Sequence, residues 1–417
     1  MNRRRYLTVV SAGTVGSLGG CLSDSPAESA SESDSNPSAT GSGGDTNTSA
    51  DSADGSADTS PAPVVTEAIT GISNPWGLAF LPDESGLLIT EQNGQLLLAD
   101  HETGDRVELS GVPAVTVQGQ GGLLDVATHP DFDSNRLVYL TYSVSGAGGS
   151  TTRVGRGQLD RDSGRLEDFE PLYTARPFVE SGGHYGSRVV IDAEGFLYVS
   201  VGDRQFKNFG PDHVAQQLDS DLGAVLRLHD DGSIPDSNPF VDEPNASSAI
   251  FTYGNRNPQG LTVHPDTGAI WESEFGERDG DEINILERGA NYGWPVADNS
   301  CGYGSDEPVG VSHADRTDVV GPVYGWECGT GGFPPSGTTF YNGDAFPDWR
   351  GDLFVAGLAK QSLAHFRVDG RDVTAVEPLL ADRGTRIRDV TVSPVTGHLY
   401  AAVDDAPAPI YRIAPGP

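Results

Sequence analysis

Short apolar runs separated by turns recur along most of the chain. From about residue 63, a run rich in β-branched and aromatic residues leads into a turn that contains Pro, Asp or Gly, and a second such run follows. Two runs joined in this way are typical of a β-hairpin. The hairpin pattern occurs six times, at residues 77–98, 123–142, 188–201, 260–274, 338–355 and 389–403.

Repetition of strand-only units predicts the architecture. The six units start roughly 45 to 80 residues apart, and repeats of about this period are typical of β-propellers. The chain is therefore predicted to be all-β, with a six-bladed β-propeller over residues 63–417. Residues 64–69 and 410–413 flank the repeats, and one segment is expected to complete the other's blade and close the ring. A two-sheet sandwich is the main alternative, but it leaves six similar units unexplained.

The first 62 residues differ in composition from the rest. Residues 1–21 hold three arginines at positions 3–5, a short apolar stretch and then Cys21, an order that resembles a twin-arginine export signal with a lipobox. We therefore expect export by that route and a lipid anchor on Cys21 at the extracellular face of the cell membrane. A chance run of arginines with a stray cysteine is the alternative. Residues 22–62 have too few apolar side chains to fold and are expected to form a disordered tether.

The chain is strongly acidic. Its 417 residues carry a net charge of −34 at pH 7, and only two of them are lysines, a combination that fits a salt-loving host. The negative electrostatic potential of such a chain repels nucleic acid and anionic membrane surfaces. We therefore expect no nucleic-acid partner, and we expect contact with the membrane only through the N-terminal lipid. Cys301 and Cys328 lie in one loop-rich region, where the sequence leaves a disulfide and two free thiols equally open.

Polar residues gather just before the innermost strand of several predicted blades, where the mouth of a propeller would lie. Together they supply four cations, two amides and one imidazole in an otherwise acidic protein, and converging cations favour an anionic ligand. A second polar cluster, the glycine turn at residues 276–282, is crowded with carboxylates and suggests a hard cation such as calcium. The first group comprises Gln120, His184, Arg256, Asn257, Lys360, Arg386 and Arg388.

Several long motifs carry a resemblance to a known family. They include GQGGLLDVATHPDF, HYGSRVVIDAEGFLYVSVGDR, YGNRNPQGL, GDEINILERGANYGWP, SGTTFYNGDAFPDW and RIRDV. Over about residues 63–417 the chain resembles the soluble glucose/sorbosone dehydrogenases, the pyrroloquinoline quinone (PQQ)-dependent aldose sugar dehydrogenases. The resemblance implies oxidation of the C1 hydroxyl of aldose sugars to lactones, with PQQ and Ca²⁺ as cofactors and an external electron acceptor. The family's six-bladed propeller agrees with the number of repeats.

The resemblance also implies roles for the polar group. His184 would act as the general base that takes the proton of the C1 hydroxyl, as suits a side chain that titrates near neutrality. Gln120 would lie at the mouth shared by cofactor and substrate. Arg256 and Asn257 would contact the quinone oxygens, and Arg256 would also stabilise negative charge on the reduced cofactor. The carboxylates of PQQ would be held by Lys360, Arg386 and Arg388, for which structural salt bridges are the alternative.

Two metal sites follow from the resemblance. The backbone carbonyls of Gly276 and Glu277 would hold a calcium beside PQQ. The family pattern has proline at the second position, and the carboxylate of Glu277 is expected to strengthen a hard-cation site. A second calcium would use Glu282 and the carbonyl region of Tyr292, with its other ligands unplaced; a solvated acidic loop is the alternative.

Two further differences from the family pattern are expected to affect the sugar-binding pocket. Gly183 stands where some family members carry an aspartate before the catalytic histidine, and Thr339 is expected to replace an aromatic that covers the sugar. Both favour a broad-specificity aldose pocket. Two functions of other classes compete with this interpretation: a calcium-dependent lactonase, which has no use for four channel cations, and a non-catalytic propeller that binds sugars or proteins at the cell surface.

Overall fold

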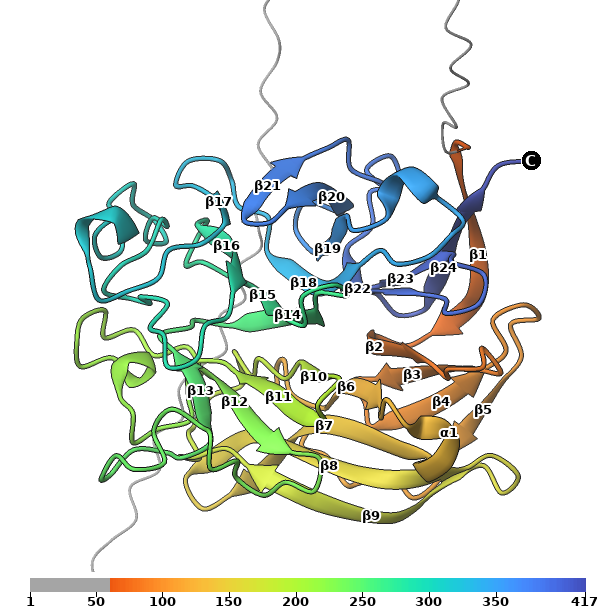
Figure 1. The fold of residues 1–417 in the computed structure, drawn as a ribbon, viewed down its shortest axis with the longest axis horizontal. Helices are drawn as coiled ribbons and strands as arrows, with labels where there is room; N and C mark the ends of the chain where they lie inside the picture. Colours follow the sequence, from red (N-terminus) through yellow and green to blue (C-terminus); the bar gives the residue numbers. More distant parts are fainter. Residues whose placement is uncertain (1–60) are drawn as a thin grey trace, which may run out of the picture. The chain divides into compact units, whose positions relative to one another are not determined.

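The computed structural model describes residues 61–417, so the predictions for residues 1–21 and for nearly all of the 22–62 tether lie outside it. The described residues form six four-stranded sheets arranged in a ring (Figure 1). All pairings between neighbouring strands of these sheets are antiparallel, and the arrangement is a six-bladed β-propeller. The predicted fold class is therefore confirmed. No helix within residues 61–417 is long and apolar enough to cross a membrane.

The strands follow the chain around the ring in blades of four, counted here from the innermost strand outwards. The first three blades are β2 (Pro75–Phe80), β3 (Leu87–Glu91), β4 (Gln95–Ala99) and β5 (Arg106–Leu109); β6 (Leu123–Thr128), β7 (Leu137–Gly146), β8 (Gly149–Asp160) and β9 (Arg165–Thr174); and β10 (Val189–Ile191), β11 (Phe196–Val201), β12 (Ala224–His229) and β13 (Ile250–Tyr253).

The remaining three blades complete the ring. They are β14 (Pro258–Val263), β15 (Ile270–Glu274), β16 (Asp281–Ile285) and β17 (Tyr324–Trp326); β18 (Pro335–Phe340), β19 (Leu353–Gly357), β20 (Ser362–Asp369) and β21 (Asp372–Ala375); and β22 (Ile387–Val392), β23 (Leu399–Val403), β24 (Ala408–Pro415) and β1 (Pro63–Ile72). The described helices are one turn of α-helix, α1 (Phe132–Asn135), and three 3₁₀ turns at Val214–Gln216, His313–Asp315 and Pro347–Trp349.

Each repeat of the sequence covers the two innermost strands of one blade, and the first, residues 77–98, also extends into β4. Their register places Leu78 opposite Ile89 in the first blade and Val126 opposite Leu140 in the second. Successive residues of a strand face opposite sides of the sheet, and both sides are covered by a neighbouring blade. Leu88 and Leu140 consequently share one buried cluster although they belong to different sheets. The core thus lies between the blades.

The ring is closed by the two ends of the described chain. β1 pairs with β24, with Val64 opposite Ala414 and Val65 opposite Ile413, so the last blade contains its outermost strand from the start of the chain (Figure 1). This confirms the predicted closure by residues 64–69 and 410–413. Antiparallel pairing at this position covers the outer edge of β24 and makes β1 the edge strand of the blade.

A buried arginine joins the innermost strands at the centre of the ring. Arg188 precedes β10, and its guanidinium contacts both Asp125 and Asp389, at 3.1 and 3.0 Å. Its Nε donates to the carbonyl of Gln259 at 2.6 Å, and its Cζ lies 4.3 Å from the centre of the Trp76 ring. With a longer contact of 3.4 Å to Ser336 Oγ, it reaches the innermost strands of all five other blades.

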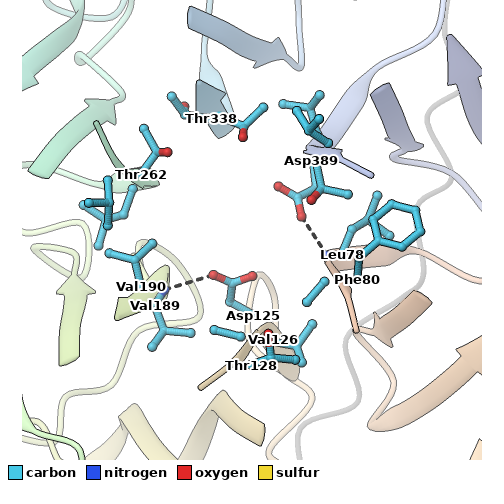
Figure 2. Close-up of a pocket in the computed structure, with 18 of the residues that line it drawn as sticks. Leu78, Phe80, Asp125, Val126, Thr128, Val189, Val190, Thr262, Thr338 and Asp389 are labelled. Atoms are coloured by element: carbon cyan, nitrogen blue, oxygen red, sulfur yellow. Dashed lines mark hydrogen bonds between the residues drawn. The ribbon is translucent and has the colours of Figure 1, made fainter. Parts of the chain in front are cut away.

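Beyond Arg188 the channel opens into a cavity of about 500 Å³ lined by the later residues of the six innermost strands. Figure 2 shows Asp125 and Asp389 pointing into it from two sides, each bonded to the backbone N–H of a neighbouring blade, Val189 and Leu78 respectively. Thr339 lines this cavity. None of the residues predicted to hold a cofactor lines this cavity, so the expectation that Thr339 replaces an aromatic over the sugar finds no support in the structure.

Candidate active site

His184 is held by a buried carboxylate. It lies in the loop before β10, and Asp203 follows β11, so the hairpin brings the two side chains together. His184 Nδ1 lies 2.6 Å from Asp203 Oδ1. Because the pKa of the Asp203 carboxyl is below its usual value, the carboxylate is ionised and can only accept. The proton of a neutral imidazole therefore resides on Nδ1, which leaves the lone pair on Nε2 to accept a proton.

Burial and charge set the basicity of this imidazole. Desolvation and the nearby Arg256 lower the pKa of His184 below its ordinary value of 6.5, against the opposing effect of Asp203. Burial alone would raise the pKa of Asp203, but the hydrogen bond and charge of His184 and the charge of Arg256 hold it down. His184 is thus neutral at pH 7 and ready to act as a base.

Asp203 has further donors that sequence reasoning missed. Its Oδ2 accepts from Trp294 Nε1 at 2.9 Å, and its Oδ1 also accepts from the backbone N–H of Gln205 at 2.8 Å. Gln120 supports the histidine from the other side, since its Oε1 accepts from the His184 N–H at 2.7 Å. The backbone of His184 is left-handed, with φ of 47°, a conformation that costs free energy in a non-glycine residue and is typical of functional sites.

Arg256 and Asn257 lie next to this dyad. The carbonyl of Arg256 accepts from the Asp203 N–H at 2.7 Å, and Asn257 Oδ1 accepts from the Gly186 N–H at 3.1 Å. Two of their own donors, Arg256 Nε and Asn257 Nδ2, are buried without a hydrogen-bond partner within residues 61–417. Buried donors without acceptors are costly, so they fit a site that receives an acceptor-rich ligand.

The carboxylate of Glu277 is not free to bind a metal. Its two oxygens are occupied by two cations, Arg256 Nη2 at 2.6 Å and Lys207 Nζ at 2.5 and 2.6 Å. The expectation that this carboxylate strengthens a hard-cation site is therefore wrong, and the reason is the charge of its neighbours. Lys207, which the sequence reasoning did not place, instead links the loop after β11 to the glycine turn.

Arg386 and Arg388 line a cavity of about 270 Å³ together with Gln120 and Trp76. Both arginines also pair with Asp404, at 2.9 Å each, so the salt-bridge alternative is realised in this structure. Lys360 is not among the residues that line the cavity. It lies two positions beyond Leu358, which does, and its exposed Nζ is 3.5 Å from the carbonyl of Thr330.

The carboxylate turn borders a second, small cavity of about 10 Å³, which Gly276, Glu282 and Tyr292 line together with Arg256. This is about the space that one water molecule or ion needs. Glu282 Oε1 is buried without a hydrogen-bond partner within residues 61–417. Its pKa is raised well above the usual value by burial and by neighbouring carboxylates.

Two of those neighbouring carboxylates were not assigned as metal ligands from the sequence. Glu274 ends β15, Asp298 lies in the loop after Trp294, and both line the small cavity. Burial raises the pKa of Glu274 to about 8 and that of Asp298 to about 7. Three buried carboxylates around one ion-sized space fit the oxygen donor set of Ca²⁺. The strand position of Glu274, where an apolar residue is usual, was the available signal; Asp298 had none.

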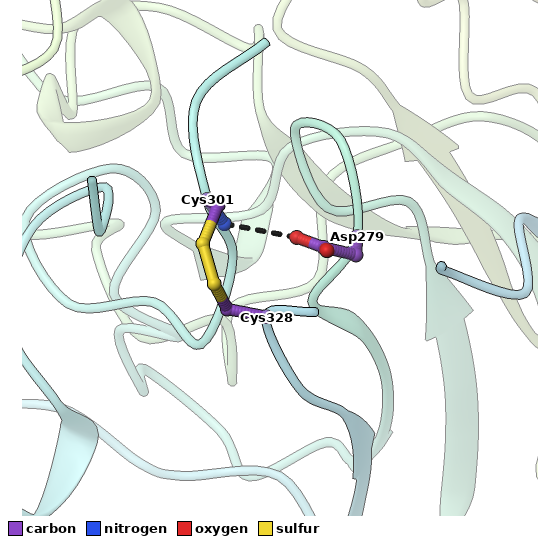
Figure 3. A group of neighbouring side chains, drawn as sticks. All are labelled: Asp279, Cys301 and Cys328. Carbon is purple, nitrogen blue, oxygen red and sulfur yellow. Dashed lines mark hydrogen bonds between the residues drawn. A yellow bond between two sulfur atoms is a disulfide. The ribbon is translucent and has the colours of Figure 1, made fainter. Parts of the chain in front are cut away.

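A third cluster, Asp279 with Cys301 and Cys328, is structural. The cysteines form a disulfide, with Cα atoms 5.2 Å apart, which settles the alternative left open by the sequence. Asp279 accepts from the backbone N–H of Cys301 at 3.0 Å and of Gly329 at 2.8 Å (Figure 3). Its carboxylate therefore fastens the loop that the disulfide closes.

The chain is similar to known proteins over most of its length. The family model described as Glucose / Sorbosone dehydrogenase matches residues 72–412. Aldose sugar dehydrogenase YliI of Escherichia coli (strain K12) is 40% identical over 361 residues, which cover 85% of this chain and 94% of the relative. Quinoprotein glucose dehydrogenase B of Acinetobacter calcoaceticus is 32% identical over 261 residues, 57% of this chain and 53% of the relative.

Solved structures show the same similarity. The apo form of the soluble aldose sugar dehydrogenase from Escherichia coli superposes with a TM-score of 0.78 at 38% identity, covering 85% of this chain and all of the other. The PQQ-bound aldose sugar dehydrogenase from Streptomyces coelicolor gives 0.69 at 26% identity, covering 85% and 99%. From the family match, the relatives and the shared propeller together, the chain belongs to the glucose/sorbosone dehydrogenase family.

Proposed function

We propose that the protein is a PQQ- and calcium-dependent dehydrogenase that oxidises the C1 hydroxyl of aldose sugars to lactones and passes the electrons to an external acceptor. Family membership supports sugar dehydrogenation, and the names of relatives that bind PQQ support the cofactor. The single observation that carries the proposal is the His184–Asp203 pair, with Nδ1 engaged at 2.6 Å and no hydrogen bond to Nε2 from residues 61–417.

The chain's own residues would move the proton. Asp203 holds the tautomer with the lone pair on Nε2, and this nitrogen takes the proton of the C1 hydroxyl while the C1 hydrogen leaves as hydride. PQQ, when bound, supplies the two-electron acceptor for that hydride. The positive charge of Arg256, fixed by Glu277 at 2.6 Å, would stabilise negative charge that develops beside it.

The residues present fit the quinone in part. Arg386, Arg388 and Gln120 line a cavity of about 270 Å³, and Arg256 and Asn257 hold buried donors without acceptors among the described residues. PQQ carboxylates would compete with Asp404 for the two arginines, with Lys360 reaching in from the edge. We keep these residues as the proposed cofactor-binding set.

Calcium is proposed at two places. Gly276 and Glu277 would offer backbone carbonyls to a metal beside PQQ. Glu282 and Tyr292, together with Glu274 and Asp298 from the same cavity, would hold a second ion, for which the orphaned Glu282 oxygen is the supporting observation.

A dye-reduction assay tests the function. Mature protein would be incubated in high salt with calcium and PQQ and then given a panel of aldoses and an artificial acceptor. Sugar-dependent reduction that requires both additions is the expected result, and His184→Asn is expected to abolish it while PQQ still binds. Stoichiometric PQQ binding without reduction of the dye by any aldose would contradict the proposed substrate. No PQQ binding would favour the non-catalytic surface propeller.

Export and anchoring are proposed on the leader sequence alone. Replacing Arg3 and Arg4 with lysine is expected to trap precursor inside the cell, measured by fractionation. A second variant, Cys21→Ser, is expected to release the exported protein from the membrane fraction. Normal export of the first variant would contradict the twin-arginine route.

A further inference from the structure

The side chain of Gln205 packs directly against the backbone of Gly183. If position 183 had a Cβ atom, that atom would lie 2.3 Å from Cδ, 2.4 Å from Oε1 and 2.6 Å from Nε2 of Gln205. These distances are far below van der Waals contact, so the amide of Gln205 occupies the space where a side chain at 183 would begin. Gly183 directly precedes His184, and the amide therefore lies beside the proposed base.

The position of Gln205 is set by the same carboxylate that holds the imidazole. Asp203 Oδ1 accepts from His184 Nδ1 at 2.6 Å and from the Gln205 N–H at 2.8 Å. Gln205 is left-handed, with φ of 64°, a strained conformation in which that hydrogen bond keeps it. A single oxygen atom thus positions both the base and the residue that carries the amide.

A second interaction holds the turn that contains Gln205 against the loop that contains His184. Arg204 is buried, and its Nε donates to the carbonyl of Gly183 at 2.9 Å. Its guanidinium lies over the Tyr185 ring, 3.4 Å from the ring centre. The turn that contains Gln205 is therefore held to the loop of His184 by two interactions, one through Asp203 and one through Arg204.

The amide itself is available to a ligand. Within residues 61–417 no group forms a hydrogen bond with the Gln205 side chain, which is exposed. The same holds for Gln120 Nε2, whose amide oxygen is the one bonded to the His184 N–H. Two amides with unengaged hydrogen-bonding groups therefore lie next to the backbone of residues 183 and 184, and no hydrogen bond from the described residues engages His184 Nε2. Each amide can donate and accept, as the hydroxyl groups of a sugar also can.

We propose that Gln205 is a specificity-determining residue that binds a sugar hydroxyl next to the reacting carbon. This inference rests on the proposed function. A neutral amide takes either hydrogen-bonding role, so it accepts aldoses that differ in the configuration of that hydroxyl, and the missing side chain of Gly183 is what gives it room.

A double-mutant cycle tests this proposal. Gln205→Ala is expected to lower kcat/KM for the preferred aldose about tenfold, the loss of one hydrogen bond of about 1.4 kcal/mol. Gly183→Ala is expected to cause a similar loss, because the new Cβ must push the amide away and no unfavourable φ stands against alanine there. In the Gln205→Ala background the same Gly183→Ala change is expected to be neutral.

Two controls separate recognition from folding. Gln205→Asn suits the left-handed backbone but shortens the amide, so it is expected to keep the thermal unfolding midpoint and still lose activity. Across a panel of monodeoxy aldoses, the intact protein is expected to discriminate about tenfold at one hydroxyl, and Gln205→Ala is expected to lose that discrimination.

Each outcome has a distinct meaning. Losses that multiply in the double variant, or unchanged kcat/KM and discrimination in Gln205→Ala, would overturn the role of Gln205 while leaving the dehydrogenase intact. Failure of the intact protein to oxidise any aldose with PQQ and calcium present would instead overturn the proposed function itself, and the inference with it.

Discussion

At the scale of single residues, the candidate site depends on how one carboxylate is shared. Asp203 receives hydrogen bonds from an imidazole, an indole and a backbone amide, at 2.6, 2.9 and 2.8 Å. Each donor stabilises the ionised form and so reduces the pull of the carboxylate on the His184 proton. The basicity of His184 is therefore adjustable through residues that do not touch the imidazole.

The pH dependence of turnover follows from the lowered pKa of His184. Burial and Arg256 hold that pKa below 6.5, so the neutral base persists as the pH falls to 6.5 and is lost only below it. The acidic limb of kcat/KM is expected to have its midpoint below pH 6.5, measured over pH 4 to 8 with an acceptor whose reduction is independent of pH. A midpoint above 6.5 would contradict the assignment of His184 as the base.

Removing one donor from Asp203 is expected to move that midpoint. Trp294→Phe keeps an aromatic ring but deletes the N–H, so the carboxylate attracts the His184 proton more strongly and the midpoint rises by about half to one pH unit. Phe209→Leu is the control, because Phe209 packs against Trp294 with ring centres 5.3 Å apart and makes no hydrogen bond to Asp203. Equal midpoints in the two variants would show that the indole N–H has no such effect.

At the scale of elements, the β15–β16 hairpin gathers the acidic groups. Glu274 pairs with Glu282 across the two strands, and like charges directly opposite each other are destabilising unless a cation or protons lie between them. The loop that follows brings Asp298 to the same small cavity. This hairpin is therefore the element whose fold is most directly linked to the proposed metal binding.

Calcium binding is expected to depend on this hairpin. Glu282→Gln keeps the shape but removes a charge from the ion-sized cavity, so calorimetric calcium affinity of the apo protein is expected to fall by at least tenfold at this site. The partner change Glu277→Gln is the control, since the carboxylate of Glu277 faces Lys207 and Arg256. A larger loss in the control than in Glu282→Gln would contradict the assignment.

The disulfide is expected to stabilise the same region. Cys301 and Cys328 are 27 residues apart, and closing a loop of that length contributes about 3 to 4 kcal/mol to the free energy of unfolding. The double change to serine is expected to lower the denaturant midpoint accordingly and to weaken calcium binding, because Asp298 lies three residues from Cys301. Unchanged calcium affinity would show that the loop keeps its position without the bond.

At the scale of the whole molecule, the blades are held together by apolar contacts between sheets and by Arg188 at the centre. Burial raises the pKa of Asp389 to about 7, even though Arg188 opposes the shift. Asp125 and Asp389 share the guanidinium of Arg188. Its removal is expected to destabilise the fold strongly, since an unpaired buried charge is costly.

Arg188→Met is expected to lower the free energy of unfolding by about 3 to 5 kcal/mol. A carboxyl whose folded pKa is raised contributes stability at low pH and loses it as the pH rises through that pKa. Without the guanidinium, the loss is therefore expected to be larger at pH 8 than at pH 6, measured by denaturant titration at both. A loss independent of pH would show that the missing packing, and not the charge, is responsible.

The sequence was a good guide to local pattern and a poor one to contacts between distant segments. The two inner strands of every blade are predicted by paired apolar runs joined by a turn, whereas outer strands such as β9 and β21 are too exposed to leave a clear apolar signal. His184 and Gln120 were found from motifs. Asp203 was missed because the β10–β11 hairpin brings it to His184 across 19 residues of chain, and Trp294 was missed because the ring brings it to Asp203 across 91 residues.

The pairing of β1 with β24 has a consequence for synthesis. The outer strand of the last blade is among the first parts of the described chain to be made, and its partner is the last. No partly translated chain can complete the ring, because a product that stops before β24 leaves β1 without its pairing partner. A closed ring therefore reports that synthesis has passed β24, the last strand of the described residues.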